Sequence, residues 1–220
     1  MSQTRSFNSI IFDLDGTLTD PREGFGGSIS FALTSLGIEA PPALALRRFI
    51  GPPIHDTFQR FLGTDDPMIV EEAVGLYRQW LGGEGIRGNT AYPGVAKMLT
   101  GLKEAGKTLF VATAKPVEFA VPILEHCGLR GFFTGVYGSR LEQANTPKGE
   151  LIRSILGDYG IFADNAVMIG DRSHDILGAR KNEVYSIGVT YGYGSAAELK
   201  AAGADVLCDS AAHVARVLSS

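Results

Sequence analysis

The feature that most constrains this chain is a short apolar run that ends in two closely spaced acids. Residues 10–12 (Ile-Ile-Phe) are typical of a buried parallel strand, and Asp13 and Asp15 follow directly. Because side chains alternate along a strand, the two carboxylates point the same way and repel each other unless a cation lies between them. Gly16 then allows a sharp turn. An acidic turn without chemistry is the alternative, but it would not need an apolar strand before it. The pattern predicts a divalent-metal site with one carboxylate free to act as a nucleophile.

Composition limits the class of protein. The 220 residues are 45% apolar and 20% charged, which is ordinary for a globular chain with one large domain or one domain carrying a smaller one. The net charge of −4 predicts no nucleic-acid partner, and no apolar run approaches the roughly 20 residues that span a bilayer. Residues 1–8 are polar and predict no secretory signal, and Cys127 and Cys208 are expected to be buried free thiols. We therefore expect a cytoplasmic protein without a membrane partner, either a monomer or a homodimer.

Two kinds of pattern divide the chain. From residue 90 onward strands alternate with helices, which predicts a doubly wound parallel sheet, an α/β fold of Rossmann-like type. Residues 20–89 carry helical patterns without a convincing strand. We therefore expect an all-helical cap inserted after the first strand of an α/β catalytic core that comprises residues 1–19 and 90–220.

Glycines stand near both ends of the expected insert, and we interpret them as flexible stems on which the cap opens and closes. They are Gly24, Gly26, Gly27, Gly82, Gly83, Gly85 and Gly88.

Within the expected core, the positions just after the strands are the candidate functional sites, because ligands of such sheets lie beyond the carboxyl ends of the strands. A strand predicted over 108–112 is followed by Thr113, Ala114 and Lys115, then a helix. A hydroxyl and backbone N–H groups at a helix start form an anion site, although Thr113 could also only cap that helix. Lys115 is expected near the bound anion or the cap.

A second apolar strand, predicted over 166–169, also ends in acid. Asp171 follows it, and we expect this carboxylate to reach the same metal as Asp13 and Asp15. Asp175 lies one helical turn later, where it can orient water around the metal. Mg²⁺ suits this small number of carboxylates because it keeps several waters. We expect His174 to be a surface or helix-start residue rather than a ligand.

The run Asp13-Leu14-Asp15-Gly16-Thr17-Leu18 resembles the first motif of the haloacid dehalogenase superfamily, whose members bind Mg²⁺ and attack phosphate esters with the first Asp. Thr113 resembles the second motif. Lys148 follows the loop after a strand expected at 132–137 and precedes a helix expected at 149–156, and it stands where the third motif has Lys or Arg. The family often reads Lys-Pro there, and this chain reads Lys-Gly. The spacing from Asp171 to Asp175 resembles the fourth motif.

The resemblance covers nearly the whole chain and is nearest to the phosphoglycolate phosphatases and the 5′-nucleotidase-like group. The Gly51-Pro52-Pro53 and Tyr191-Gly192-Tyr193-Gly194 runs also look like that subgroup. It implies an enzyme, a Mg²⁺-dependent phosphomonoester hydrolase that acts on a small phosphorylated metabolite through an aspartyl-phosphate. Phosphoglycolate or a nucleoside monophosphate is the substrate it favours.

Each motif residue receives a role from this resemblance. Asp13 would be the nucleophile, Asp15 the general acid and base, and Lys148 the cation that stabilises transferred charge. The metal would be held by Asp13, the Asp15 carbonyl and Asp171, with Asp175 behind them. The substrate phosphate would contact Gly16, Thr113, Ala114 and Lys115, and the cap residues expected to meet the substrate are Arg47, Arg48 and His55.

Two other chemistries known on this core do not suit the residues of this chain. Dehalogenases do not need an acid at Asp15, and phosphonatases need a cap lysine, whereas the first lysine here is Lys97. A phosphoglucomutase-like isomerase and a non-catalytic phosphate-sensing protein remain open as alternatives.

Overall fold

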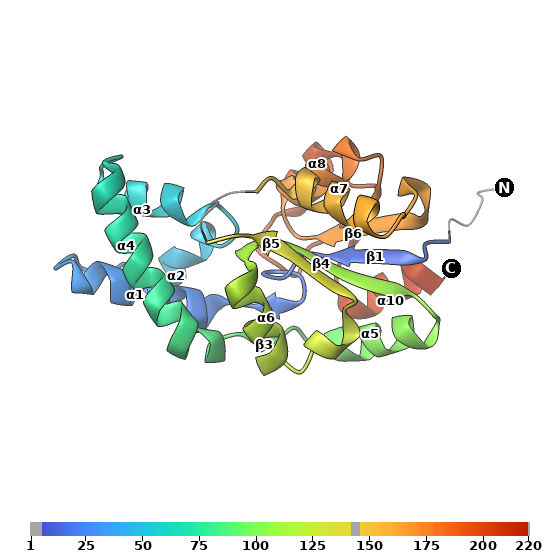
Figure 1. Ribbon diagram of the computed structural model, residues 1–220, viewed down its shortest axis with the longest axis horizontal. Coiled ribbons are helices and arrows are strands. Elements are labelled where there is room, and N and C mark those ends of the chain that lie inside the picture. The colour runs from blue at the N-terminus through green and yellow to red at the C-terminus, as the bar shows by residue number, and fades with distance from the viewer. Residues whose placement is uncertain (1–5, 142–145, 220) are drawn as a thin grey trace. The chain divides into compact units, whose positions relative to one another are not determined.

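The computed structural model describes residues 6–141 and 146–219 (Figure 1). Residues 1–5, which belong to the polar N-terminal run, and Asn145, in the loop before Lys148, lie outside the described residues. The chain divides into two compact units. One combines Met1–Asp20 with Ala91–Ser220, and the other is Pro21–Thr90.

The first unit is built on a six-stranded parallel sheet with strand order β5-β4-β1-β6-β7-β8. The first strand lies between two later ones, with Phe12 opposite both Val111 and Ile169. The expected α/β class with a parallel sheet is therefore confirmed. The strands are β1 Ser9–Phe12, β4 Thr108–Pro116, β5 Gly135–Ser139, β6 Ala166–Gly170, β7 Tyr185–Val189 and β8 Val206–Cys208.

Helices cover both faces of this sheet. Figure 1 shows α7 and α8 over one face and α5, α6 and α10 over the other. The helices of this unit are α5 Val95–Glu104, α6 Val117–His126, α7 Lys148–Asp158, α8 Ser173–Lys181, α9 Ala196–Ala202 and α10 Ala211–Ser219.

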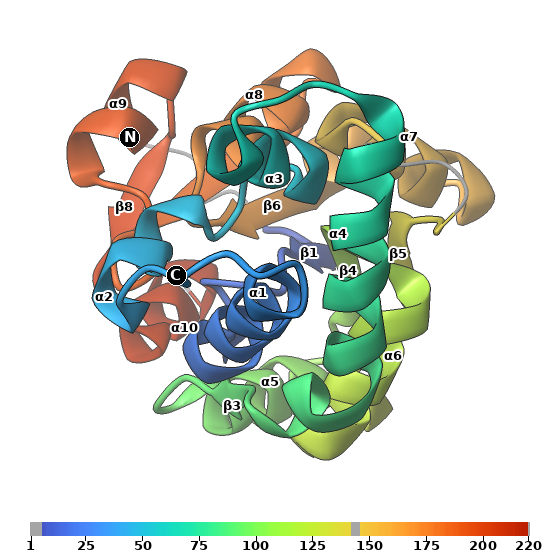
Figure 2. The same ribbon diagram turned by 90° about the vertical axis from the view of Figure 1, so that its left-hand side faces the viewer.

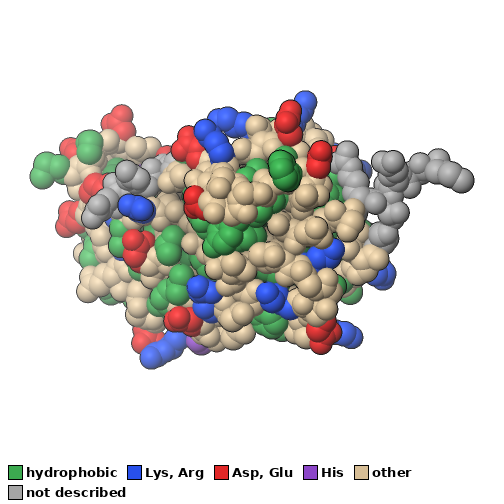
Figure 3. Space-filling view, turned by 45° about the vertical axis from the view of Figure 1, so that its right-hand side comes forward, with side chains coloured by type: hydrophobic (Ala, Val, Ile, Leu, Met, Phe, Trp, Pro, Cys, Tyr) green, Lys and Arg blue, Asp and Glu red, His purple; other side chains and the backbone are tan. Residues whose placement is uncertain are grey.

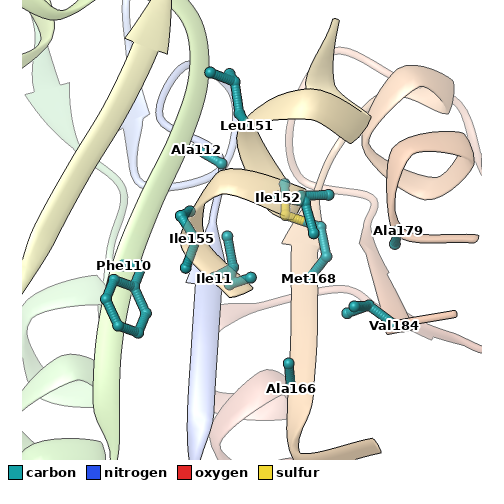
Figure 4. Close-up of a cluster of buried hydrophobic side chains, with 10 residues drawn as sticks. All are labelled: Ile11, Phe110, Ala112, Leu151, Ile152, Ile155, Ala166, Met168, Ala179 and Val184. Atoms are coloured by element: carbon teal, nitrogen blue, oxygen red, sulfur yellow. The ribbon is translucent and has the colours of Figure 1, made fainter. Parts of the chain in front are cut away.

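A buried apolar cluster fixes α7 on the sheet (Figure 4). Ile152 and Ile155 of α7 pack with Ile11, Phe110 and Met168 of three neighbouring strands, and all five are buried. Burying a side chain of this size stabilises the fold by about 1.5–3 kcal/mol. Because α7 begins at Lys148, this packing also places that lysine at the carboxyl edge of the sheet.

Two elements of this unit differ from their predicted bounds. The strand expected at 132–137 is β5, Gly135–Ser139, because Arg130–Phe132 form a 3₁₀ turn before it. The strand expected to end near residue 112 continues to Pro116, with an irregular register after Thr113. Short apolar runs indicate that a strand exists more reliably than where it ends.

The second unit is helical, and Figures 1 and 2 show its two longest helices, α1 and α4, side by side. Tyr77 of α4 makes edge contacts with Phe25 of α1 and Phe58 of α3. The helices are α1 Arg22–Ser35, α2 Ala43–Leu46, α3 Ile54–Leu62 and α4 Pro67–Trp80, with a 3₁₀ turn at Arg47–Phe49 and a π-helical turn at Leu81–Gly85.

Two short strands that the sequence did not predict pair where the chain passes between the units. They are β2 Thr19–Asp20 and β3 Thr90–Ala91. Strands of two residues carry no periodic pattern, so periodicity could not reveal them.

The interpretation of the glycines as flexible stems is wrong for Gly24 and Gly88, which pack closely against backbone, whereas a Cβ on Gly83 would meet no atom within 4 Å. Gly24, Gly26 and Gly27 lie inside α1. A Cβ on Gly24 would lie 2.2 Å from the carbonyl oxygen of Gly85, and a Cβ on Gly88 would lie 2.4 Å from the backbone nitrogen of Gly24. The Gly24 N–H also donates to the Gly88 carbonyl at 3.0 Å. These glycines allow two backbone segments to approach closely.

The helices and one face of the surface show the following features. No helix within residues 6–141 and 146–219 is long and apolar enough to cross a bilayer. On the face drawn in Figure 3, acidic and basic side chains are interspersed without a large cluster of one sign.

We expect opposite effects from alanine at two helix-interior glycines. Gly24→Ala should lower the free energy of unfolding by about 1–3 kcal/mol, because its methyl group meets backbone that cannot move aside. Gly75→Ala, in α4 with no atom within 4 Å of the new methyl group, should raise it by up to about 1 kcal/mol. Denaturant unfolding of both variants beside the unchanged protein checks this, and a stabilising Gly24→Ala would contradict the close-packing explanation.

Candidate active site

The ends of β1 and β6 bring two acids to one edge of the sheet. The Asp13 N–H donates to the Ile169 carbonyl at 2.9 Å, which extends the pairing of these strands by one residue. Asp171 follows β6 and lies against the turn at Gly16, where an added Cβ would be 2.2 Å from Asp171 Oδ2. Gly16 also has φ +86°. Only glycine suits this position, since the turn needs both a left-handed backbone and room for the carboxylate.

Lys148 lies between two acids. Its Nζ donates to Asp13 Oδ1 at 2.8 Å and to the Ala112 carbonyl at 2.7 Å, and it forms an ion pair with Asp175 Oδ1 at 2.7 Å. Burial acts to lower the pKa of Lys148, but the two carboxylates outweigh it and hold that pKa above its ordinary value. The sequence placed this lysine near the site only through a family resemblance, because an isolated lysine is usually solvated.

Burial also perturbs the acids. It raises the pKa of Asp13 to about 6, with a further increase from Asp175 and an opposing effect of Lys148. The pKa of Asp171 lies well above its usual value, first because of burial and then because of the neighbouring charges of Asp13 and Asp175. Asp175 has a lowered pKa: burial opposes ionisation there, but the Lys148 ammonium prevails.

The charges at this edge do not balance. The charged residues that are buried in the described part of the chain are Asp13, Asp171, Asp175 and Lys148, so the buried charged groups are three carboxylates and one ammonium. Asp171 Oδ1 is buried and has no hydrogen-bond partner, whereas its Oδ2 accepts the Tyr193 N–H at 2.7 Å. A buried, unpartnered carboxylate oxygen in an acidic cluster fits a bound divalent cation.

A second group of possible ligands lies close by. Ligand atoms of Asp13, His174 and Asp175 all lie within 4.8 Å of one another. The ammonium of Lys148 is already within ion-pair distance of both acids of this group, so a cation there would face a like charge. His174, expected to be a surface residue, has a side chain 37% exposed with Nε2 3.6 Å from Asp175 Oδ1.

The carboxyl end of β4 contains Thr113 and Lys115. Thr113 is buried within β4 and its Oγ1 accepts the Lys115 N–H at 3.1 Å. Since α6 begins only at Val117, Thr113 is not its cap, which removes that alternative. Lys115 Nζ lies 2.9 Å from Asp15 Oδ2, so this lysine forms an ion pair with the residue expected to be the general acid. Ala114 is exposed, and its carbonyl accepts the Ser139 hydroxyl.

The loop after β7 is the part of the site whose role sequence reasoning missed. The Tyr191 hydroxyl donates to the Thr17 carbonyl at 2.9 Å, and Tyr193 contacts Asp171 through its backbone. In the sequence, the alternating Tyr-Gly-Tyr-Gly run stands out only through its likeness to the family. Glycines spaced by two after a strand were the available signal of close backbone approach.

The expected cap residues lie in the helical unit. Arg48 stacks over the Phe49 ring with its guanidinium carbon 4.9 Å from the ring centre. His55 Nε2 lies 2.8 Å from Glu71 Oε1. These side chains therefore have neighbours within their own unit.

Comparison with known proteins identifies the family. The sequence profile of the family described as haloacid dehalogenase-like hydrolase matches residues 10–189. The chain belongs to this family. A 5′-nucleotidase of Pseudomonas aeruginosa is 44% identical over 97% of this chain and 96% of its own length. A phosphoglycolate phosphatase of Caulobacter vibrioides is 31% identical, over 92% of this chain and 86% of its own.

Two further proteins are similar to this chain over most of its length. A crystal structure described as a predicted phosphatase from Clostridium acetobutylicum superposes with a TM-score of 0.89 at 38% identity, covering 96% of this chain and 97% of that one. A Mycobacterium tuberculosis protein named tyrosine-protein kinase PtkA is 34% identical over 85% of this chain and 63% of its own length. The prediction of a haloacid dehalogenase-like enzyme of the phosphatase class, near the 5′-nucleotidases and phosphoglycolate phosphatases, is confirmed.

We expect Lys148→Met to destabilise the protein in a pH-dependent way. In buffer without divalent cations at pH 8, the loss of the ammonium leaves Asp13 and Asp175 buried without a cation, at a cost of about 3–5 kcal/mol. The folded-state pKa values of both acids then rise, so protonation at lower pH removes the penalty, and the deficit should shrink towards pH 5.

Denaturant unfolding at both pH values checks this, with Lys97→Met, at an exposed position in α5, as the control. Equal stability of Lys148→Met and the unchanged protein at pH 8 would contradict this account of the buried charges.

Proposed function

We propose that the protein hydrolyses a small phosphomonoester with Mg²⁺ bound at the carboxyl edge of the sheet and Asp13 as the nucleophile. The observation that supports this most is the excess of buried carboxylates, with Asp171 Oδ1 left without a hydrogen-bond partner. The proposed substrate is phosphoglycolate or a nucleoside monophosphate, as the named activities of two relatives suggest.

Mg²⁺ would be held by Asp13, Asp171 and the backbone carbonyl of Asp15. When bound, it neutralises charge on the phosphoryl oxygens and on the buried carboxylates. Asp175 supports this arrangement from behind, because its Oδ2 accepts the Arg172 N–H at 3.1 Å and so shapes the turn that follows Asp171. We prefer these ligands to the group containing His174, since Lys148 already lies within ion-pair distance of both acids of that group.

The first proposed step transfers the phosphoryl group to the protein. Lys148 binds Asp13 Oδ1, and the other carboxylate oxygen attacks phosphorus in line. The bond from phosphorus to the leaving oxygen breaks, and that oxygen takes a proton from Asp15. An aspartyl-phosphate and the free alcohol result.

The second proposed step returns the protein to its starting state. Asp15, now ionised, takes a proton from a water molecule whose oxygen attacks phosphorus, and the Asp13 carboxylate leaves as inorganic phosphate forms. The ion pair with Lys115 keeps the Asp15 carboxylate in a defined place between the steps. Lys148 remains beside the transferred group throughout and stabilises its charge.

The phosphate itself is proposed to be bound by backbone N–H groups and one hydroxyl. Gly16, Thr113 and Ala114 would supply them, since a hydroxyl that accepts one hydrogen bond still has its own proton to donate. We propose that the helical residues 20–89 act as a cap over the core 1–19 and 90–220. Arg47, Arg48 and His55 would then help to select the leaving group.

The test is release of inorganic phosphate from a panel of phosphorylated metabolites that includes phosphoglycolate and nucleoside monophosphates. We expect turnover with Mg²⁺ and none after chelation. Asp13→Asn should lower the rate by at least about a thousandfold because an amide cannot act as the nucleophile. Asp164→Asn, at an exposed position in the same unit, is the matched control and should keep its activity.

Full activity of Asp13→Asn would overturn the nucleophile assignment. Interconversion of sugar phosphates without phosphate release would instead identify a phosphoglucomutase-like isomerase. A folded protein that binds phosphate esters without turnover would identify a phosphate-sensing role.

A further inference from the structure

The loop that follows β7 packs directly on the proposed metal ligand. A Cβ on Gly192 would lie 2.3 Å from the Gly16 carbonyl oxygen and 2.5 Å from Asp171 Cβ. A Cβ on Gly194 would lie 1.8 Å from the Asp171 carbonyl oxygen. No residue with a side chain fits at either position without displacing the loop. The backbone of residues 192–194 therefore forms the surface against which Asp171 rests.

Tyr193, between these glycines, contacts two acids at once. Its backbone N–H donates to Asp171 Oδ2 at 2.7 Å, and its hydroxyl donates to Asp20 Oδ1. Because Oδ2 is held by this N–H, the unpartnered Oδ1 has a fixed direction. Asp20 is the second residue of β2 and precedes Pro21, where the chain enters the helical unit.

The turn after Asp171 is held independently from α9. Glu198 Oε1 accepts the Ser173 N–H at 2.8 Å and the Arg172 Nε–H at 3.0 Å. These bonds fix the backbone of the turn but do not touch the Asp171 carboxylate. Loss of the Tyr193 hydroxyl should therefore leave the turn folded and change only the placement of the carboxylate.

We propose that Tyr193 is a positioning residue for divalent-cation binding. Its hydroxyl bonds to Asp20, and this bond fixes the position of the Tyr193 backbone N–H, which in turn orients Asp171. This inference rests on the metal site of the proposed function and extends it to Asp20, which is not among the proposed ligands. Partners of metal ligands typically change metal affinity by 10–100-fold when they are lost. Since Tyr193 keeps its N–H in any variant, the lower end of that range applies.

A comparable tyrosine–aspartate bond elsewhere in the unit provides the control. The Tyr137 hydroxyl of β5 donates to Asp158 Oδ2 of α7, and neither residue has a contact with Asp171 among those described. Tyr137→Phe thus removes the same kind of bond from a place outside the proposed site. If the Tyr193 bond were only structural, both variants would lose stability and neither would lose affinity for the metal.

The experiment is calorimetric titration of Mg²⁺ into the metal-free, full-length protein, with no substrate present. Tyr193→Phe and Asp20→Ala should each raise the Kd for Mg²⁺ by about tenfold, and the double variant by no more than either alone. Asp20→Asn, which keeps an acceptor oxygen, should restore most of the affinity. Tyr137→Phe should stay within about twofold of the unchanged protein.

Each outcome decides the matter. If the unchanged protein binds Mg²⁺ and Tyr193→Phe binds it equally well, the inference is overturned while the metal site stands. If the unchanged protein does not bind Mg²⁺, the metal site of the proposed function is overturned and this inference with it. Should Tyr193→Phe fail to fold, Asp20→Ala decides, and an unchanged Kd in that variant overturns the inference.

Discussion

Burial of three carboxylates together with only one ammonium is the constraint on which this structure depends. An ionised carboxylate taken out of water is strongly destabilising unless a cation or several hydrogen bonds compensate it. Lys148 compensates Asp13 and Asp175 directly, and Asp171 receives only one N–H. The fold remains stable despite these buried charges because its core is stabilised by the apolar packing of α7 against β1, β4 and β6.

The same arrangement connects stability with function. A cation bound by the folded chain and not by the unfolded one stabilises the fold by mass action. Under the proposed function, charge that is unfavourable in the metal-free protein would become the source of cation affinity. The raised pKa values of Asp13 and Asp171 reflect the cost of ionising these buried acids. Strand order makes this possible, since β1 lies between β4 and β6 and all three strands end at one edge.

The sequence predicted the parts of the site that follow from local pattern. Apolar runs that end in acid located Asp13, Asp15 and Asp171 because strand periodicity and strand ends are local properties. It could not predict that Lys115 would pair with Asp15, or that Tyr193 would reach Asp20, because those partners are separated by 100 and 173 positions. Glycine alone also does not distinguish a flexible stem from a close contact between helices, and so Gly24 was misinterpreted.

The most direct test of the central claim is to trap the phosphoryl group on the protein. In the Asp15→Asn variant, Asp13 should still attack the phosphorus of an aryl phosphate that is radiolabelled on its phosphoryl group, because the aryl leaving group needs little help from an acid. The same variant should activate water poorly, so the label should stay on the protein. After acid quenching and proteolysis, the account predicts label on the peptide that contains Asp13, and no label when Asp13→Asn is added. Label on another residue, or phosphate release by the unchanged enzyme with no label on Asp13 in any variant, would contradict it.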